Sequence, residues 1–163
     1  MRAKIWSAGV GAAIALAAGF PASVSAHAAP GPESFTVIVV GNAPQLFIAR
    51  GTIDATGTAV PLSGGTNGGT DQVELPGGTF MLTLQNTSGQ PGGRPKPPTC
   101  IAAFHGAGKS TIFDGTGDFA GTEGTGTFTF HGVFFATRTA HGCSQRQGTA
   151  IDIVQDHGTV TLG

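Results

Sequence analysis

The sequence is poor in charge, in aromatic hydroxyl groups and in cysteine. Only 10% of its 163 residues are Asp, Glu, Lys or Arg, whereas an ordinary soluble domain has about 25%. Tyrosine is absent, which removes phenol acid–base chemistry and a common sugar-stacking side chain, and the single tryptophan is Trp6. Because 39% of the residues are hydrophobic, disorder of the highly charged kind is disfavoured as well. These shortages weigh against a carbohydrate-binding module and against an unfolded chain.

Glycine is abundant, with 28 residues, where average usage of roughly 7% predicts about 11. Each helical glycine costs about 1 kcal/mol relative to alanine, which makes a helical bundle unfavourable. Glycine does not recur at every third position, and this excludes collagen. Many glycines stand directly before threonine, a pair typical of a tight turn that leads into a strand.

The first 28 residues have the order of a secretory signal peptide. Arg2 and Lys4 form a basic start, residues 5–20 are uncharged and apolar or small, and Ala26 and Ala28 are the small residues of a cleavage site. The apolar stretch falls short of the roughly 20 residues of a membrane-spanning helix. We expect cleavage after Ala28, or alternatively after Ala26. Residues 29–163 are then expected to form one domain that is secreted or held at the cell envelope, without membrane insertion.

The mature chain is predicted to be acidic. Loss of Arg2 and Lys4 leaves six basic and nine acidic residues, a net charge of −3 with neutral histidines. An acidic chain without a basic cluster lacks the positive surface that attracts nucleic acid or anionic lipid. We therefore expect no nucleic-acid partner, and the sequence does not indicate an oligomeric state.

The two cysteines, Cys100 and Cys143, are predicted to pair. Neither has a CxxC partner, and the only nearby histidine is His141. In an oxidising compartment a disulfide is favoured over a metal pair or a catalytic thiol. Such a bond closes a loop of about 44 residues, which contributes about 4 kcal/mol in the chain-entropy model.

Alternation with a period of two dominates the mature chain, and no helical stripe exceeds two turns. The pattern predicts an all-β domain of seven to nine strands, arranged as a single antiparallel up-and-down β-barrel of about eight. In residues 35–40 apolar side chains occur at both odd and even positions, so we expect this strand to be covered on both faces. The candidate lumen or core residues are the apolar members of the alternating segments: Phe35, Val37, Phe80, Leu82, Phe104, Phe128, Phe130, Ile151 and Ile153.

Three further segments are expected to be loops or turns. Residues 63–71 lack apolar side chains and predict a mobile loop. Residues 85–98 contain four prolines, which forbid a central strand. Residues 103–110 resemble a relaxed phosphate-binding loop, but no helical pattern follows Lys109, and we expect a β-turn between strands.

The densest glycine block is a turn that also carries three carboxylates: Asp114, Gly115, Gly117, Asp118, Gly121 and Glu123. Paired carboxylates are able to act as acid and base or to hold Ca²⁺. The favoured interpretation is that they solubilise an exposed turn and accept its backbone N–H groups. The histidines of the mature chain lack ligand spacing, and no local catalytic motif is present. We therefore predict no metal and no cofactor, and we assign no catalytic residue.

The segment from Ile112 to Phe128 contains the pattern GTGxFxGxxGxGxF. Here the chain resembles the allene oxide cyclase-like barrel superfamily, which includes dirigent proteins and many small secreted bacterial proteins. The resemblance implies an eight-stranded antiparallel barrel with a largely apolar lumen, from about Phe35 to Gly163. Members include cyclases and proteins that steer radical coupling. The pocket residues of dirigent proteins have no match here, so the resemblance implies the fold and no catalytic residue.

These observations favour non-catalytic binding of a small apolar molecule in the lumen, or an envelope-associated role. A small closed barrel rich in phenylalanine offers an apolar interior for such a ligand. Two alternatives stay open, an isomerase or cyclase of the same superfamily and an envelope interaction module without a ligand. The enzyme alternative requires titratable side chains that face the lumen.

Overall fold

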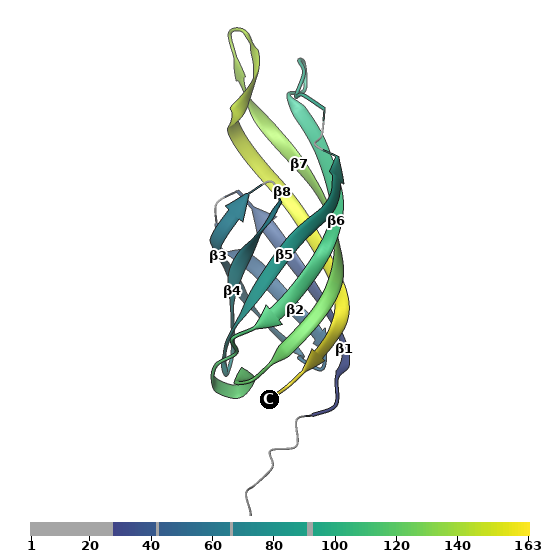
Figure 1. Cartoon of the computed structure of the whole chain (residues 1–163). Coiled ribbons are helices and arrows are strands. Elements are labelled where there is room, and N and C mark those ends of the chain that lie inside the picture. Colours follow the sequence, from purple (N-terminus) through teal and green to yellow (C-terminus); the bar gives the residue numbers. More distant parts are fainter. Residues whose placement is uncertain (1–27, 42, 66, 91–92) are drawn as a thin grey trace, which may run out of the picture.

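The chain forms a closed antiparallel barrel of eight strands, in which each strand pairs with its sequence neighbour and the last pairs with the first (Figure 1). The computed structural model describes residues 28–41, 43–65, 67–90 and 93–163, so the predicted signal peptide lies outside the described residues except for Ala28. The predicted fold class is confirmed. The elements in chain order are β1 (Gly31–Val40), β2 (Gln45–Gly51), β3 (Ala55–Gly65), β4 (Gly68–Leu75), β5 (Gly78–Gln90), β6 (Ile101–Phe113), the 3-10 turn η1 (Gly117–Phe119), β7 (Glu123–Thr139) and β8 (Gly142–Thr161).

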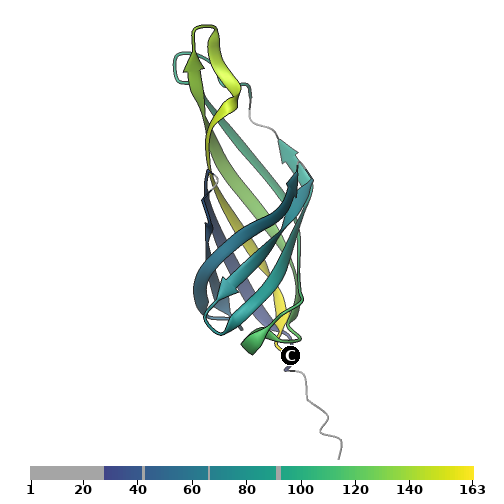
Figure 2. The same cartoon turned by 90° about the vertical axis from the view of Figure 1, so that its left-hand side faces the viewer.

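The barrel is uneven because its strands differ in length, from seven residues in β2 to 17 in β7 and 20 in β8. The β7–β8 hairpin therefore extends beyond the other strands, at the end opposite the C-terminus (Figures 1 and 2). We call this end the upper end and the end with the C-terminus the lower end. Among the described residues, no helix has the length and apolarity needed to cross a membrane.

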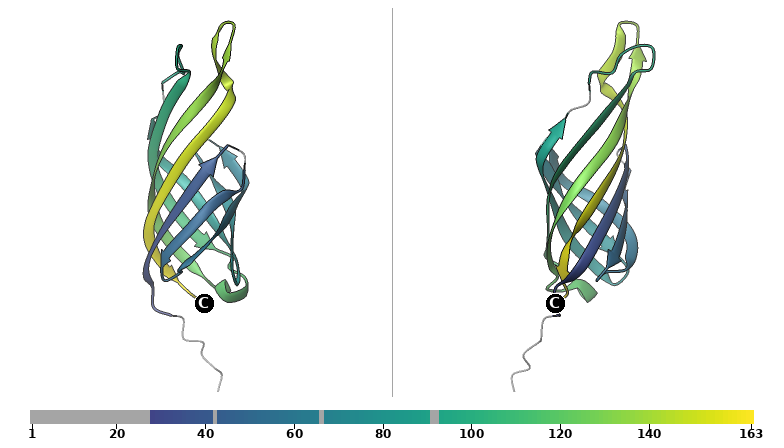
Figure 3. Two further views of the ribbon diagram at one scale, coloured as in Figure 1. Left: turned by 180° about the vertical axis from the view of Figure 1, so that it is seen from behind. Right: turned by 90° about the vertical axis from the view of Figure 1, so that its right-hand side faces the viewer.

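The predicted disulfide is present between Cys100 and Cys143, with a Cα–Cα distance of 5.3 Å. Cys100 lies in the loop between β5 and β6, and Cys143 lies near the start of β8. The bond joins this loop to the protruding hairpin, and both are seen at the upper end of the molecule (Figure 3). The backbone supports the junction, because Ala136 N–H donates to the Cys100 carbonyl at 2.9 Å.

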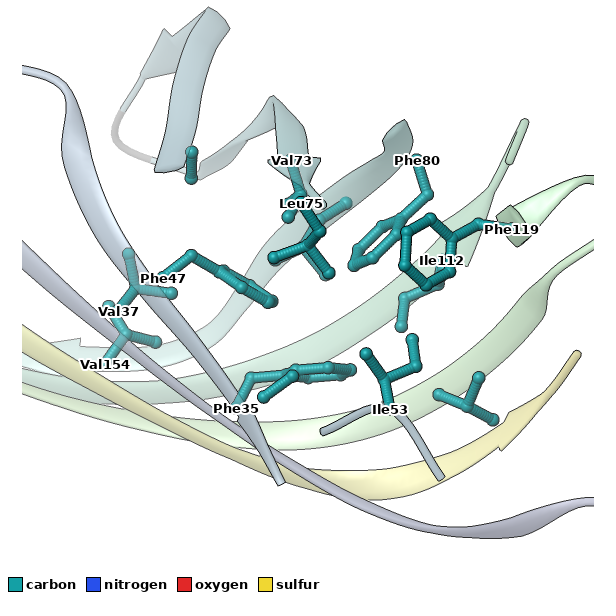
Figure 4. Close-up of a cluster of buried hydrophobic side chains, with 14 of the residues drawn as sticks. Phe35, Val37, Phe47, Ile53, Val73, Leu75, Phe80, Ile112, Phe119 and Val154 are labelled. Carbon is teal, nitrogen blue, oxygen red and sulfur yellow. The ribbon is translucent and has the colours of Figure 1, made fainter. Parts of the chain in front are cut away.

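Apolar side chains fill the lower part of the lumen (Figure 4). Phe80 is fully buried at the centre of this core, and its ring centroid lies 5.9 Å from that of Phe47 and 5.8 Å from that of Phe119. Phe119 belongs to η1, so the Gly-rich turn closes the lower end with an aromatic side chain. The buried core also includes other residues of the barrel strands: Phe35, Val37, Ala49, Ala59, Val73, Leu75, Leu82, Ile112, Phe128, Val154 and Val160.

Several glycines in β6 and β7 face inward and lie beneath phenylalanine rings. A Cβ atom on Gly108 would collide with the Phe128 ring, and one on Gly132 would collide with the Phe104 ring. These residues are in the middle of strands, where glycine leaves room for a ring from the neighbouring strand. Part of the glycine excess therefore serves packing rather than turns.

The prediction that Ile151 and Ile153 line the lumen is wrong. Both side chains lie on the outer surface and are 41% and 44% exposed. The register of β8 with β1 pairs Val154 with Val37 and places the even-numbered residues of β8 inside. Since successive side chains of a strand alternate between the two faces, the neighbouring isoleucines must face outward. Of the other candidates, Phe104 and Phe130 are half-buried, and the remaining five lie in the buried core.

Four local predictions are also wrong. Most of residues 63–71 belong to β3 and β4, where Gly64 pairs with Gly69 and Gly65 with Gly68. Residues 103–110 lie inside β6, and β5 continues to Gln90 before the prolines begin. A backbone ladder needs no apolar side chain, so composition alone misplaces such strand ends. The outer side of β1 is not covered either, since Val40 is exposed.

Candidate functional site

A cavity of about 270 Å³ lies in the upper lumen, above the apolar core. The end of the β3–β4 hairpin forms one side of it, with Gly64, Gly65, Gly68 and Gly69. The remaining wall combines apolar and polar side chains, and none of its described residues is basic. This wall consists of Gln45, Pro61, Ser63, Asp71, Leu84, Asn86, Phe128, Phe130, Asp152 and Val154.

Two aspartates supply the negative charge of the cavity. Asp71 is on β4 and Asp152 is on β8, strands that lie on opposite sides of the eight-stranded ring. Asp71 is only 8% exposed, and its carboxylate has no hydrogen bond within the part of the chain that the structure describes. The Asp152 Oδ1 atom is buried and likewise has no hydrogen-bond partner among the described residues.

Burial raises the pKa of both cavity aspartates above the ordinary value of 3.8, because the charged form loses its hydration. For Asp71 no opposing interaction is present among the described residues. For Asp152 the backbone N–H of Ile153 and the nearby His131 act in the opposite direction. The cavity therefore presents two carboxylates whose burial is only partly compensated at Asp152 and is not compensated by the described residues at Asp71.

A third inward aspartate, Asp156, lies lower on β8, in register with Phe128 of β7 and Phe35 of β1. It is 2% exposed, and its carboxylate lies beside the Ser110 hydroxyl without a well-formed hydrogen bond to any described residue. Burial raises its pKa, while the neighbouring Ser110 hydroxyl and His157 lower it to a smaller extent. Asp156 does not line the cavity, so we expect its buried charge to lower the free energy of unfolding of the barrel.

Glu33 has a different role at the lower end. Its Oε2 atom accepts a hydrogen bond of 2.6 Å from the backbone N–H of Ile53 in the β2–β3 turn. Burial raises the pKa of Glu33, and this and other backbone hydrogen bonds oppose the rise. The contact ties β1 to the turn that closes the barrel, so we assign Glu33 to structure.

The carboxylates of the Gly-rich turn do not belong to the cavity. Asp114, Asp118 and Glu123 are exposed and surround η1 at the lower end, away from the cavity. No group of three or more His, Cys, Asp or Glu side chains in the described ranges is placed to hold a metal ion. The turn instead supports Phe119, whose ring packs against Phe80.

The cavity aspartates were missed by the sequence analysis, although a signal exists. Asp71 has the parity of Val73 and Leu75, and Asp152 has the parity of Val154. Side chains two positions apart on a strand face the same side. Once one inward residue of the strand is known, an acid at an even spacing from it is therefore predicted to face the core. In β8, however, the odd-numbered positions hold two isoleucines and are more apolar than the even-numbered ones. The odd-numbered positions were therefore predicted to face the lumen.

The chain matches no family model, no curated protein and no solved structure. The resemblance of residues 112–128 to the allene oxide cyclase-like superfamily therefore stays a prediction. What the fold and site define is a class: a small, disulfide-linked, closed antiparallel barrel with an acidic cavity in its upper lumen.

The buried carboxylates predict an unusual dependence of stability on pH. Each has a higher pKa in the folded than in the unfolded chain, so the folded state binds protons more tightly. The free energy of unfolding should therefore decrease as the pH rises through the raised folded-state pKa values, and increase as the pH falls through them toward the ordinary aspartate value of 3.8. Asp156→Asn removes one such charge and should stabilise the protein by about 1–3 kcal/mol near pH 7.

Urea unfolding at several pH values checks this prediction. Asp156→Asn should show a flatter pH profile than the wild type, whereas Asp118→Asn, which changes an exposed aspartate, should follow the wild-type profile. A loss of stability in Asp156→Asn near neutral pH would show that the Asp156 charge has a stabilising partner.

Proposed function

We propose that the protein binds a small organic cation with an apolar body in the upper lumen, without changing it chemically. The observation that carries the proposal is a cavity lined by Asp71 and Asp152 together with Leu84, Phe128 and Phe130. A bound cation would pair with the Asp71 carboxylate, which is buried without compensation, and with the Asp152 carboxylate, which is compensated only in part. This ligand class replaces the purely apolar molecule expected from the sequence, because an uncharged ligand would leave the carboxylates unpaired.

The dimensions of the cavity support a small ligand. Its volume of about 270 Å³ is slightly below the roughly 300–1,000 Å³ of typical ligand pockets. An amine attached to one aromatic ring or a short alkyl chain is of suitable size. Cation–π contact with the rings of Phe128 and Phe130 would add to the carboxylate interaction.

We further propose that this binding takes place outside the cytoplasm, in a secreted or envelope-held protein. The Cys100–Cys143 disulfide supports such a location, since disulfides persist in oxidising compartments. The N-terminal sequence pattern supports export independently.

Three probes of one shape but different charge test the ligand class: phenethylammonium, 2-phenylethanol and phenylacetate. Calorimetric titration near neutral pH should show tightest binding of the ammonium ion. A charge-assisted hydrogen bond contributes about 1.5–3 kcal/mol, so we expect an advantage of roughly tenfold or more over the alcohol. Equal affinities for the alcohol and the ammonium ion would contradict the proposal.

The aspartates are tested by substitution. Asp71→Asn and Asp152→Asn should weaken ammonium binding by about tenfold while leaving the affinity for the alcohol nearly unchanged. Asp118→Asn serves as a control of equal charge change, and it should bind all three probes as the wild type does. Ammonium affinity should also fall as the pH drops through the raised pKa values of Asp71 and Asp152, because protonated carboxyls lose their charge.

The inward aspartates also favour a second function, that of an isomerase. Carboxyl groups with raised pKa values in a partly apolar cavity are suited to transfer protons at a higher pH than ordinary aspartates do. Recovery of a bound carbonyl probe from D₂O distinguishes the two functions. Deuterium incorporation that is lost in Asp152→Asn supports catalysis, and recovery without exchange supports binding alone.

A further inference from the structure

The outer surface of the upper barrel carries an apolar patch that extends over five strands. Six of the seven large apolar side chains that are exposed among the described residues belong to it. The patch lies on the outer side of β1, β2, β6, β7 and β8. Its exposed members are Val40, Leu46, Ile101, Phe135, Ile151 and Ile153.

Strand register makes this patch continuous. In one cross-strand row Leu46 pairs with Ile38, which pairs with Ile153. In the next row Val40 pairs with Ile151, which pairs with Val133, and in a third Ile101 pairs with Phe135. Residues directly opposite each other on neighbouring strands project from the same face. A contiguous exposed apolar area of this kind marks an interaction surface.

Positive charge is concentrated at the same end of the molecule. Lys96 pairs with Ile101 in an isolated bridge, and Arg138 pairs with Cys143 next to the disulfide. Arg94 lies two residues before Lys96 in the same loop, and Arg146 follows Cys143 in β8. All four are exposed, and none makes a salt bridge with any described residue. We call Arg94, Lys96, Arg138 and Arg146 the basic tip.

The exposed acids lie at the other end. Asp54 is in the β2–β3 turn and Glu74 is close to the β4–β5 turn. Asp118 is in η1, and Asp114 and Glu123 lie on either side of it. Sequence segments 88–113 and 124–151 contain no acidic residue at all. The folded molecule is therefore polarised, although its mature net charge is slightly negative.

We propose that the upper end docks on a bilayer rich in anionic phospholipid. The apolar patch would contact the boundary between headgroups and acyl chains, and the basic tip would contact the lipid phosphates. Surface-bound proteins combine these two interactions, and each Lys or Arg near an anionic surface strengthens binding by about fivefold. The acidic lower end would then point away from the surface, which avoids electrostatic repulsion.

Two other occupants are less favoured. A second copy of the chain would cover the apolar patch, but it provides no acid near the basic tip, since the exposed acids lie at the lower end. A soluble acidic partner would account for the basic tip but not for the exposed isoleucines beside it. An anionic bilayer satisfies both features with one surface.

Vesicle co-sedimentation of the mature protein tests the proposal. Vesicles of phosphatidylcholine mixed with phosphatidylglycerol should bind the protein, and vesicles of phosphatidylcholine alone should bind it much more weakly. Arg146→Gln should reduce binding to the mixed vesicles by about fivefold. Lys109→Gln removes the same charge from the side of the barrel and should have a much smaller effect. Added salt should weaken the interaction because it screens the headgroup charge.

The apolar patch is tested with a second matched pair. Phe135→Ser should weaken vesicle binding by about tenfold, since most of an aromatic contact is lost. Leu62→Ser changes an apolar residue outside the patch that is 56% exposed, compared with 43% for Phe135, and it should bind as the wild type does. Circular dichroism shows whether each variant is folded.

Three outcomes would overturn the proposal: no binding to the mixed vesicles, equal binding to both kinds of vesicle, or equal losses in each matched pair. A concentration-dependent dimer that Phe135→Ser dissociates, seen by sedimentation velocity, would assign the patch to a second copy instead. The lumen is not involved in these measurements, so their failure leaves the ligand proposal untouched.

Discussion

Replacement of Phe80 by alanine is expected to lower the free energy of unfolding by about 3–5 kcal/mol. Phe80 is fully buried, and its ring contacts the rings of Phe35, Phe47 and Phe119, which come from two strands and the lower turn. Truncation leaves a cavity that the closed barrel is poorly able to fill, because the strands are held by hydrogen bonds on both sides. Urea denaturation followed by circular dichroism measures the loss.

Phe135→Ala is the matched control for this substitution. It removes the same atoms from a side chain that is 43% exposed on the outer surface, so a change of less than about 1 kcal/mol is expected. A similar loss in both variants would indicate that the free energy depends on phenylalanine removal in general rather than on the core. Loss of Phe80 should also increase hydrogen exchange in η1, whose only buried residue is Phe119.

Removal of the disulfide is expected to have an effect of similar size. Cys100 and Cys143 are separated by 43 residues, and closure of such a loop in the unfolded chain corresponds to about 4 kcal/mol in the chain-entropy model. The double variant Cys100→Ala, Cys143→Ala should retain the barrel, because neither cysteine belongs to the apolar core. Its denaturation midpoint should decrease, and its protruding hairpin should exchange amide hydrogens faster than the lower strands.

Reduction provides the control for the disulfide experiment. A thiol reductant should destabilise the wild type by the same amount and leave the double variant unaffected. Titration of two free thiols in the unreduced mature protein, or equal stability of the wild type and the double variant, would contradict the prediction. The basic tip should also lose its order in the double variant, since the bond joins the loop that contains Lys96 to the strand that follows Arg138.

Period-two alternation was sufficient to predict the barrel and much of its core. Phe35, Phe80 and Phe128 lie inside as expected, because bulky apolar residues in strands with polar neighbours have one favourable face. The same reasoning failed for Ile151 and Ile153, whose neighbours Asp152 and Val154 face inward. Both the odd-numbered and the even-numbered positions of this segment contain apolar residues. The odd-numbered set is more apolar and was predicted to face inward, which is the wrong face.

The candidate site was less predictable than the fold. Asp71 and Asp152 are distant in sequence, and only closure of the barrel brings β4 and β8 to the same cavity. The predicted loop at residues 63–71 is in fact part of the cavity wall, because glycine strands pair through their backbone alone. The Gly-rich turn, which was the most conspicuous motif, closes the lower end and stays outside the cavity.

The sequence by itself determined the class of fold, the pairing of the two cysteines and the overall charge, since each follows from local pattern or from counting. Only the tertiary structure decided which side chains share a surface. Four basic residues from two distant segments meet at the upper end, where the disulfide joins those segments, and the exposed acids gather at the other end. The physical reason is that alternation of side chains defines two faces for each strand but does not say which face is inside. The pairing register around the closed barrel determines the inner face, and the position of each turn determines the end of the barrel at which its charges lie.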